Sequence, residues 1–179
     1  MLETLDRFTR PFQYLLVGMV LASILVSFYH ARAVQSVSIQ LLDGVEERRD
    51  HRIPLLHKEE EALPDYQLDL MVDEAWHTVG TVINQSAVEP IVYPVKETVN
   101  VSYLQRLRII EADGLESDLL EEIAVEEESG QGHQYAYSLE TGYSFGAGVA
   151  WFFKTPVGRA ILTGIIIVVV LTLLSSGIF

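Results

Sequence analysis

The strongest constraint in this sequence is an apolar run at its C-terminal end, residues 160–179, which contains no charged side chain over twenty residues. As an α-helix, a segment of that length rises about 30 Å, which matches the hydrocarbon core of a bilayer. Helices and strands in the core of a soluble protein seldom run so far without a charge. The run therefore predicts a transmembrane helix over residues 160–179.

Residues 146–159, just before this run, combine small, aromatic and basic side chains. Aromatic rings and cations gather where the hydrocarbon core meets the lipid headgroups. We therefore expect a collar at the membrane interface, made of Trp151, Phe152, Phe153, Lys154 and Arg159. Small residues ahead of an apolar tail also occur in signals that are replaced by a lipid anchor, but the spacer here is aromatic rather than polar.

A second apolar stretch near the N-terminus, residues 14–29, is shorter and follows a polar arm at residues 1–13. Extended over residues 14–33, it is long enough for a marginal span, and the favoured interpretation is an uncleaved signal-anchor helix. The arm carries as many acids as arginines, and the apolar core is long for a signal peptide. A cleaved signal peptide stays an alternative, because residues 31–33 have the small-x-small form of a cleavage site.

Two pairs of small residues in this stretch are spaced four positions apart, Gly18 with Ala22 and Ser23 with Ser27. Such pairs let the backbone of a second helix approach closely. They predict a helix-packing surface, although small residues are frequent in any apolar helix.

Residues 34–145 form the polar middle of the chain, where apolar and polar side chains alternate with the period of half-buried β-strands. Gly80 marks a bulge in one of these strands, and Pro90 and Pro94 confine residues 88–95 to a sheet edge or an extended linker. The predicted strands cover residues 37–41, 66–73, 75–83, 99–110 and 135–139.

One helix is also predicted in this middle domain. The apolar side chains of residues 115–124 recur at helical spacing, with acids on the other face. The expected fold class is mainly β: a small antiparallel, sandwich-like domain with one helix, flanked by N- and C-terminal transmembrane helices.

The charge balance argues against several classes of function. The chain has 25 acidic and 12 basic residues, a formal net charge of −13, and binding to nucleic-acid phosphates needs clustered cations. It has no cysteine, which excludes disulfides, thiolate catalysis and cysteine-bound metals. Many acids with few lysines resemble the composition of proteins from salt-adapted organisms, and the lack of cysteine favours a prokaryotic or viral source.

Two signals disagree about the side of the membrane on which the middle domain lies. Basic residues flank the domain near both apolar stretches, which favours the cytoplasm, although that rule weakens for long loops. The only two asparagines, Asn84 and Asn100, both begin N-x-S sequons and are candidate N-glycosylation sites. We expect an integral membrane protein whose middle domain lies outside the cytoplasm.

No catalytic motif emerges from the remaining residues. The five histidines form no metal-binding pair of known spacing, and His51, His57 and residues 59–61 fit an exposed charged loop better than a metal site. No phosphate loop or nucleophile elbow occurs. Trp76 and the tyrosines fit core positions and cross-strand pairs better than a recognition face. We expect no enzyme activity, no cofactor and no small-molecule substrate.

The expected function is that of a non-catalytic, membrane-anchored structural or accessory subunit of a membrane-associated assembly. The assembly would be a multisubunit membrane complex or the membrane layer of a virion, and the expected partners are the bilayer and neighbouring proteins. The alternative is a cell-surface receptor or adhesion module with an extracellular β domain. A hydrolase would need a cleft with perturbed carboxylates or histidines.

Overall fold

The computed structural model describes residues 2–47, 63–112 and 117–175, with the side chains between residues 14 and 170 of these ranges. The chain divides into two compact units. One is a β unit, Ala33–Gly142, and the other is a helical unit built from the residues on either side of it.

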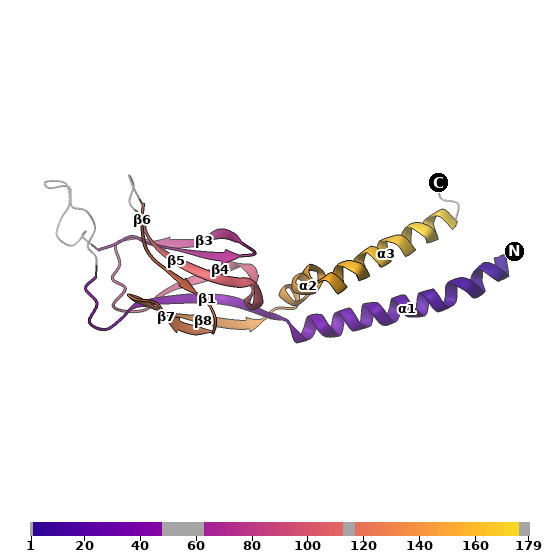
Figure 1. Ribbon diagram of the computed structural model, residues 1–179, viewed down its shortest axis with the longest axis horizontal. Coiled ribbons are helices and arrows are strands. Elements are labelled where there is room, and N and C mark those ends of the chain that lie inside the picture. Colours follow the sequence, from indigo (N-terminus) through magenta and orange to yellow (C-terminus); the bar gives the residue numbers. More distant parts are fainter. Residues whose placement is uncertain (1, 48–62, 113–116, 176–179) are drawn as a thin grey trace. The chain divides into compact units, whose positions relative to one another are not determined.

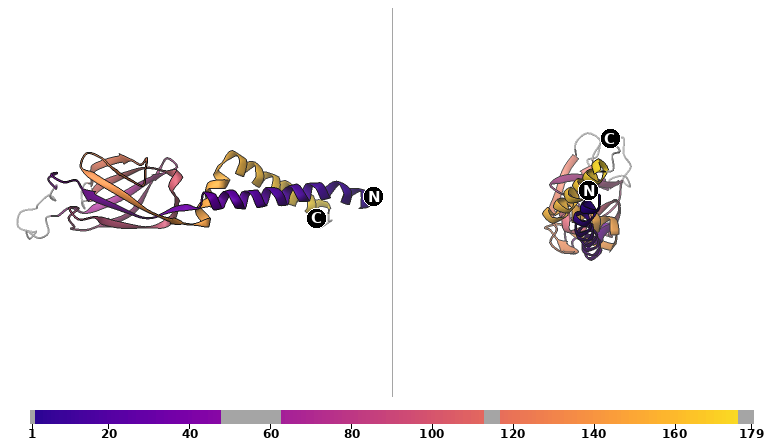
Figure 2. Two further views of the ribbon diagram at one scale, coloured as in Figure 1. Left: turned by 90° about the horizontal axis from the view of Figure 1, so that it is seen from below. Right: turned by 90° about the vertical axis from the view of Figure 1, so that its right-hand side faces the viewer.

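The β unit consists of two four-stranded sheets (Figures 1 and 2), and the strands pair antiparallel. The first sheet has the order β4-β1-β8-β7 and the second has the order β3-β2-β5-β6. The strands of the first sheet are β1 (Arg32–Leu41), β4 (Ile91–Asn100), β7 (Ser129–Gln131) and β8 (Tyr135–Tyr143). Those of the second are β2 (Tyr66–Val72), β3 (Ala75–Val82), β5 (Leu104–Ala112) and β6 (Ser117–Ala124).

Apolar side chains from both sheets form one core between them. On β2, Tyr66, Leu68 and Leu70 face this core and are at most 1% exposed. Val37 and Ile39 of β1 belong to the same core and are fully buried. Burying an aliphatic side chain of this size contributes about 1.5–3 kcal/mol, so these alternating positions hold the sheets face to face. The predicted mainly β domain of antiparallel sheets is confirmed.

Two finer features predicted from the sequence are also confirmed. β4, which contains Pro94, is an end strand of its sheet, where a residue without an N–H interrupts hydrogen bonding least. In the β2–β3 pair, the register skips Val79, directly before Gly80. The glycine therefore lies beside a bulge, as its position within an alternating strand indicates.

The helix predicted at residues 115–124 is wrong. Residues 113–116 lie outside the described part of the chain, and the rest of the segment is strand β6, paired antiparallel with β5. Ile123 is buried, whereas Leu119 is 58% exposed. The apolar spacing that resembles a helix arises from a bulge, because the pairing with β5 skips Leu120. Strand pairing therefore overrides the helical preference of leucine, glutamate and alanine in this segment.

The helical unit contains α1 (Leu2–Tyr29), α2 (Phe145–Lys154) and α3 (Pro156–Ser175), and α1 contacts both of the others. The side chain of Ser144 caps α2 by accepting a hydrogen bond from the backbone N–H of Ala147. α2 ends where Thr155 is extended, and Pro156 then opens α3. Proline fits the first turn of a helix but lacks the N–H that would continue the preceding one. The two helices are bent by 88° relative to each other.

No single helix in the described part of the chain is long and apolar enough to cross a bilayer. α2 and α3 as far as Val170 meet that requirement only together, as the bent pair, and residues 14–29 form a shorter apolar segment. The predicted flanking transmembrane helices are therefore not supported as straight single spans. The prediction for residues 160–179 also includes residues 176–179, which lie outside the described range.

Candidate functional site

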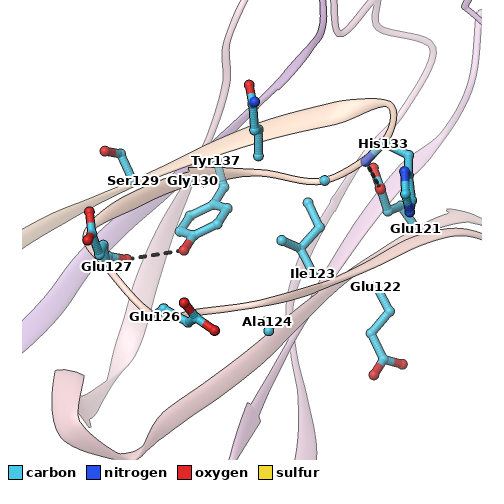
Figure 3. A pocket seen from close by; sticks show the side chains of 12 residues that line it. Glu121, Glu122, Ile123, Ala124, Glu126, Glu127, Ser129, Gly130, His133 and Tyr137 are labelled. Carbon is cyan, nitrogen blue, oxygen red and sulfur yellow. Dashed lines mark hydrogen bonds between the residues drawn. The ribbon is translucent and has the colours of Figure 1, made fainter.

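A groove of about 440 Å³ opens between β6 and β7, which are end strands of the two sheets. Residues 125–128 carry the chain directly from one strand to the other, so the groove lies where a short connection joins the sheets. Ile123 and Tyr137 line its middle (Figure 3). The charged and titratable side chains along it are Glu121, Glu122, Glu126, Glu127 and His133.

Glu121 is the buried acid of this groove, with 8% of its surface exposed. Its carboxylate accepts hydrogen bonds from three successive backbone N–H groups of the β7–β8 turn: His133, Gln134 at 3.1 Å and Tyr135 at 2.9 Å. A Cβ atom at Gly132 would overlap this carboxylate, so a larger residue there would displace the carboxylate from its present position. Three aligned N–H dipoles offset the charge of Glu121, which makes it a structural anchor of the turn.

The other acids of the groove are exposed or paired. Glu122 forms an ion pair of 2.5 Å with Arg106, and its side chain points away from the groove (Figure 3). Glu126 and Glu127 are exposed on the turn, and the Tyr137 hydroxyl donates a hydrogen bond of 3.2 Å to the backbone carbonyl of Glu127. Among the described residues, no three acidic or histidine side chains are placed to hold a metal ion. What the groove offers chemically is a negatively charged surface.

A second polar cluster lies inside the sandwich, around the hydroxyls of Tyr66, Tyr93 and Tyr135. The Tyr66 hydroxyl donates to Oε1 of Glu47 at 2.9 Å and lies 3.4 Å from the Tyr135 hydroxyl. The Tyr93 hydroxyl donates to the backbone carbonyl of Tyr66 at 2.9 Å. Burial raises the pKa of all three hydroxyls above the ordinary tyrosine value. They are therefore neutral donors that connect strands of the two sheets.

Glu47, in the connection that follows β1, links this cluster to the loop between β3 and β4. Its Oε1 also accepts from the backbone N–H of Ala87 at 2.6 Å, and its Oε2 accepts from the Ser86 hydroxyl at 2.8 Å. A carboxylate with several donors is well satisfied when partly buried. Glu47 therefore holds the β3–β4 loop against the sandwich.

The side of the second sheet away from the core carries a charged pair of its own. Nε and Nη2 of Arg108 donate to Oδ2 of Asp69 at 2.9 and 2.7 Å, and Asp69 is only 1% exposed. The Arg108 guanidinium also lies 4.3 Å from the centre of a Trp76 ring. The Trp76 ring stacks on the guanidinium and covers the ion pair. This intramolecular contact explains the position of the Trp76 side chain without a bound ligand.

The two sequon asparagines have different surroundings. Asn84 is exposed in the loop between β3 and β4. Asn100 ends β4 and is 5% exposed, and its Oδ1 accepts a hydrogen bond of 2.9 Å from the backbone N–H of Ser102. The structure therefore separates two positions that look equivalent in the sequence.

The residues of the predicted interfacial collar lie on α2 and in the first turn of α3. Trp151 stacks on His30 with ring centres 3.5 Å apart. Phe152 is 4% exposed and contacts Phe153 edge to face, whereas Lys154 and Arg159 are exposed. The two cations thus flank the bend between the helices, and Phe152 packs inside the helical unit.

The two predicted small-residue pairs also differ in their surroundings. Ser23 and Ser27 are buried, whereas Gly18 and Ala22 are exposed. A Cβ atom at Gly148 of α2 would overlap the backbone carbonyl of Ser27, so the close helix contact depends on that glycine. The spacing of small residues on α1 does not predict the contact with Gly148, because it carries no information about the partner helix.

The charged loop considered as a metal site, with His51, His57 and residues 59–61, lies outside the described residues. No protein-family model matches the chain, and no curated protein is significantly similar to it.

Proposed function

We propose that this chain is a membrane-anchored, non-catalytic structural or accessory subunit of a membrane-associated assembly. In this proposal the helical unit is embedded in the bilayer, and the β unit faces water outside the cytoplasm and contacts neighbouring subunits. The observation that carries the proposal is the apolar surface that the helical unit exposes.

Several large apolar side chains on α1 and α3 are more than half exposed, which is energetically unfavourable in water. On α1, Leu15, Leu21 and Leu25 are 59%, 56% and 70% exposed, and on α3, Ile166 and Ile167 are 54% and 53% exposed. Complete burial of such a side chain contributes about 1.5–3 kcal/mol, and a side chain that is half exposed in water forgoes roughly half of that. Exposed apolar surface of this extent is typical of contact with lipid or with another protein.

The residues around the bend between α2 and α3 favour lipid as that contact. Lys154 and Arg159 lie on either side of the bend, and Trp151 lies one turn before it. Cations and tryptophan prefer the headgroup layer. We therefore propose that α2 lies along this layer and that α3 enters the hydrocarbon core, with residues 14–29 of α1 beside it.

The polar groups of the β unit support a non-catalytic role. Glu121 holds a turn, Glu47 holds a loop, and the Asp69 carboxylate is bound by Arg108. Each of these carboxylates therefore has a structural task. The end strands of the two sheets and the acidic groove supply surfaces for neighbouring subunits.

The alternative, a cell-surface receptor or adhesion module, is favoured by the groove between β6 and β7. A soluble form of the β unit would then capture an external ligand, and Glu126→Lys together with Glu127→Lys would weaken that capture. An accessory subunit instead needs its helical unit to remain with its partners. Stoichiometric co-purification of the full chain with other membrane proteins in mild detergent supports the accessory role, and a lone monomer excludes it.

The proposed placement in the membrane can be tested by labelling single introduced cysteines. The chain contains no cysteine of its own, so a thiol reagent reacts only at the introduced position. Glu126→Cys, on an exposed turn of the β unit, should react with a membrane-impermeant maleimide on intact cells. Thr9→Cys, in the arm before the first apolar stretch, should react only after the membrane is permeabilised. Alkaline carbonate should leave the chain in the membrane pellet.

Two outcomes would contradict the placement. Release of the chain by carbonate would exclude integration into the bilayer. Reaction of Thr9→Cys on intact cells, with Glu126→Cys protected, would put the β unit on the cytoplasmic side.

A further inference from the structure

We infer that Asn84 carries an N-linked oligosaccharide and that Asn100, although it begins an equivalent sequon, does not. The inference rests on the proposed position of the β unit outside the cytoplasm, because N-linked glycosylation marks surface loops of domains on that side. It is carried by the different surroundings of the two side chains in the fold.

Asn84 lies on a turn that presents its side chain to solvent. It follows β3 by two residues and has φ +52°, a conformation that asparagine tolerates better than most residues. Its backbone N–H donates to Oδ1 of Asp65 at 2.7 Å, and its Oδ1 accepts from the backbone N–H of Leu63 at 3.2 Å. The turn is thus held in place while the side chain stays exposed, which leaves room for a bulky group.

Asn100 has the opposite surroundings. It pairs with Ala33 of β1 at the end of β4, and it caps the 3-10 turn Val101–Tyr103 through the hydrogen bond to Ser102. With 5% of its surface exposed, the side chain has no space for a sugar. An oligosaccharide at Asn100 would require the side chain to leave this packing and would break the cap, so a chain modified there does not reach the same fold.

The transfer reaction needs an asparagine whose side-chain nitrogen reaches a transferase. The nitrogen forms a bond to C1 of an oligosaccharide carried on a lipid phosphate, and the bond between C1 and the phosphate oxygen breaks. The amide loses one proton to the transferase, the lipid phosphate leaves, and nothing is oxidised or reduced. The co-reactants are therefore a lipid-linked oligosaccharide and a membrane transferase.

The place of Asn84 in the fold gives the modification a consequence. The loop that carries it joins β3 to β4, and these are end strands of the second and the first sheet. End strands are the parts of a sandwich most prone to pair with another chain. A sugar chain on this loop would stand beside both of them.

The test uses the full chain, expressed in cells that add N-linked glycans, and analyses the protease-resistant, folded fraction by mass spectrometry. Asn84→Asp and Asn100→Asp are matched variants, because aspartate keeps the side-chain oxygen and tolerates positive φ. Glu127→Asn creates a reporter sequon with residues 128 and 129 on an exposed turn of the same unit. Treatment with a glycan-removing amidase identifies the modification.

We expect one glycan on the folded chain, lost in Asn84→Asp, kept in Asn100→Asp and joined by a second in Glu127→Asn. A glycan on Asn100 in the folded fraction would overturn the inference. Modification of the reporter without modification of Asn84 would also overturn it and leave the placement intact. If neither is modified, the inference fails, and the maleimide reaction of Glu126→Cys shows whether the proposed placement fails with it.

Discussion

Asp69 and Glu121 are two of the three acids that are buried in the described part of the β unit, in a chain that has 25 acidic residues. Arg108 binds the first through two N–H groups, and three backbone N–H groups bind the second. Burying a charged group without such partners costs several kcal/mol. With so many acids in the sequence, only their environment distinguishes these two from the exposed ones.

Replacing Glu121 by alanine should lower the free energy of unfolding of the β unit by about 1–3 kcal/mol, since three N–H groups lose their acceptor. Denaturant titration of the detergent-solubilised chain, followed by tyrosine fluorescence, measures this. Glu122→Ala is the control, because it removes an exposed ion pair with Arg106 and should change stability by less than about 1 kcal/mol. Equal losses in both variants would contradict the anchoring role of Glu121.

The buried tyrosines predict a loss of stability at high pH. Their pKa is raised in the folded state, above an unfolded value of about 10. Below that value both states are protonated, and the contribution to stability is complete. As the pH rises above it, the unfolded chain releases protons first, so the free energy of unfolding should fall by up to about 1.4 kcal/mol per pH unit for each tyrosine.

Denaturant titrations across this pH range measure the slope, and tyrosinate absorbance reports ionisation directly. Tyr93→Phe should reduce the slope, because it removes one of the three hydroxyls with a raised pKa. An unchanged slope in this variant, or full ionisation of all eight tyrosines in the folded chain near the ordinary pKa, would contradict the buried cluster.

At the scale of elements, contact partners decide what each segment becomes. β6 has a local sequence that suits a helix, but its backbone pairs with β5 and its Ile123 side chain enters the core. α2 is a short helix. It can approach α1 closely only because Gly148 has no side chain. Both elements therefore depend on a neighbour that is distant in the sequence.

Gly148→Ala should destabilise the packing of α2 on α1 by about 1–3 kcal/mol, because the new methyl group would overlap the Ser27 carbonyl. Gly146→Ala in the same helix is the matched control. A Cβ there makes only an ordinary contact, at 3.9 Å from the Ser144 hydroxyl, so it should be neutral or slightly stabilising. Thermal unfolding in detergent, followed by the circular dichroism of the helices, compares the two variants. A greater loss of stability in Gly146→Ala than in Gly148→Ala would contradict this packing.

At the scale of the whole molecule, the chain separates into two units with different chemistry. The β unit has its own core, formed between its two sheets, and includes the acidic groove. The helical unit exposes apolar side chains along α1 and α3. In the described part of the chain, the hydrophobic core of the β unit contains no residue of the helical unit. We therefore expect the two units to unfold independently.

The β unit alone, Ala33–Gly142, should therefore be soluble without detergent and unfold in one cooperative transition. Circular dichroism should show β structure, and analytical ultracentrifugation should show whether the fragment stays dispersed. Aggregation or gradual unfolding of the fragment, with cooperative unfolding of the full chain in detergent, would show that the β unit depends on the helices.

The sequence by itself determined the β class, the position of most strands, the end position of β4 and the bulge beside Gly80. These features depend on local patterns, since a period of two residues, a proline or a glycine acts through its own backbone. The apolar ends were also visible in the sequence, although the helices there do not form the straight spans that their composition predicts.

Only the tertiary structure decided that residues 117–124 are a strand, that Glu121 binds a turn, and that Asn84 is exposed while Asn100 is buried. Each of these depends on a partner far away in the chain: β5, the β7–β8 turn, and β1 beside β4. Pairing and burial are properties of two segments together, so no pattern within one segment specifies them.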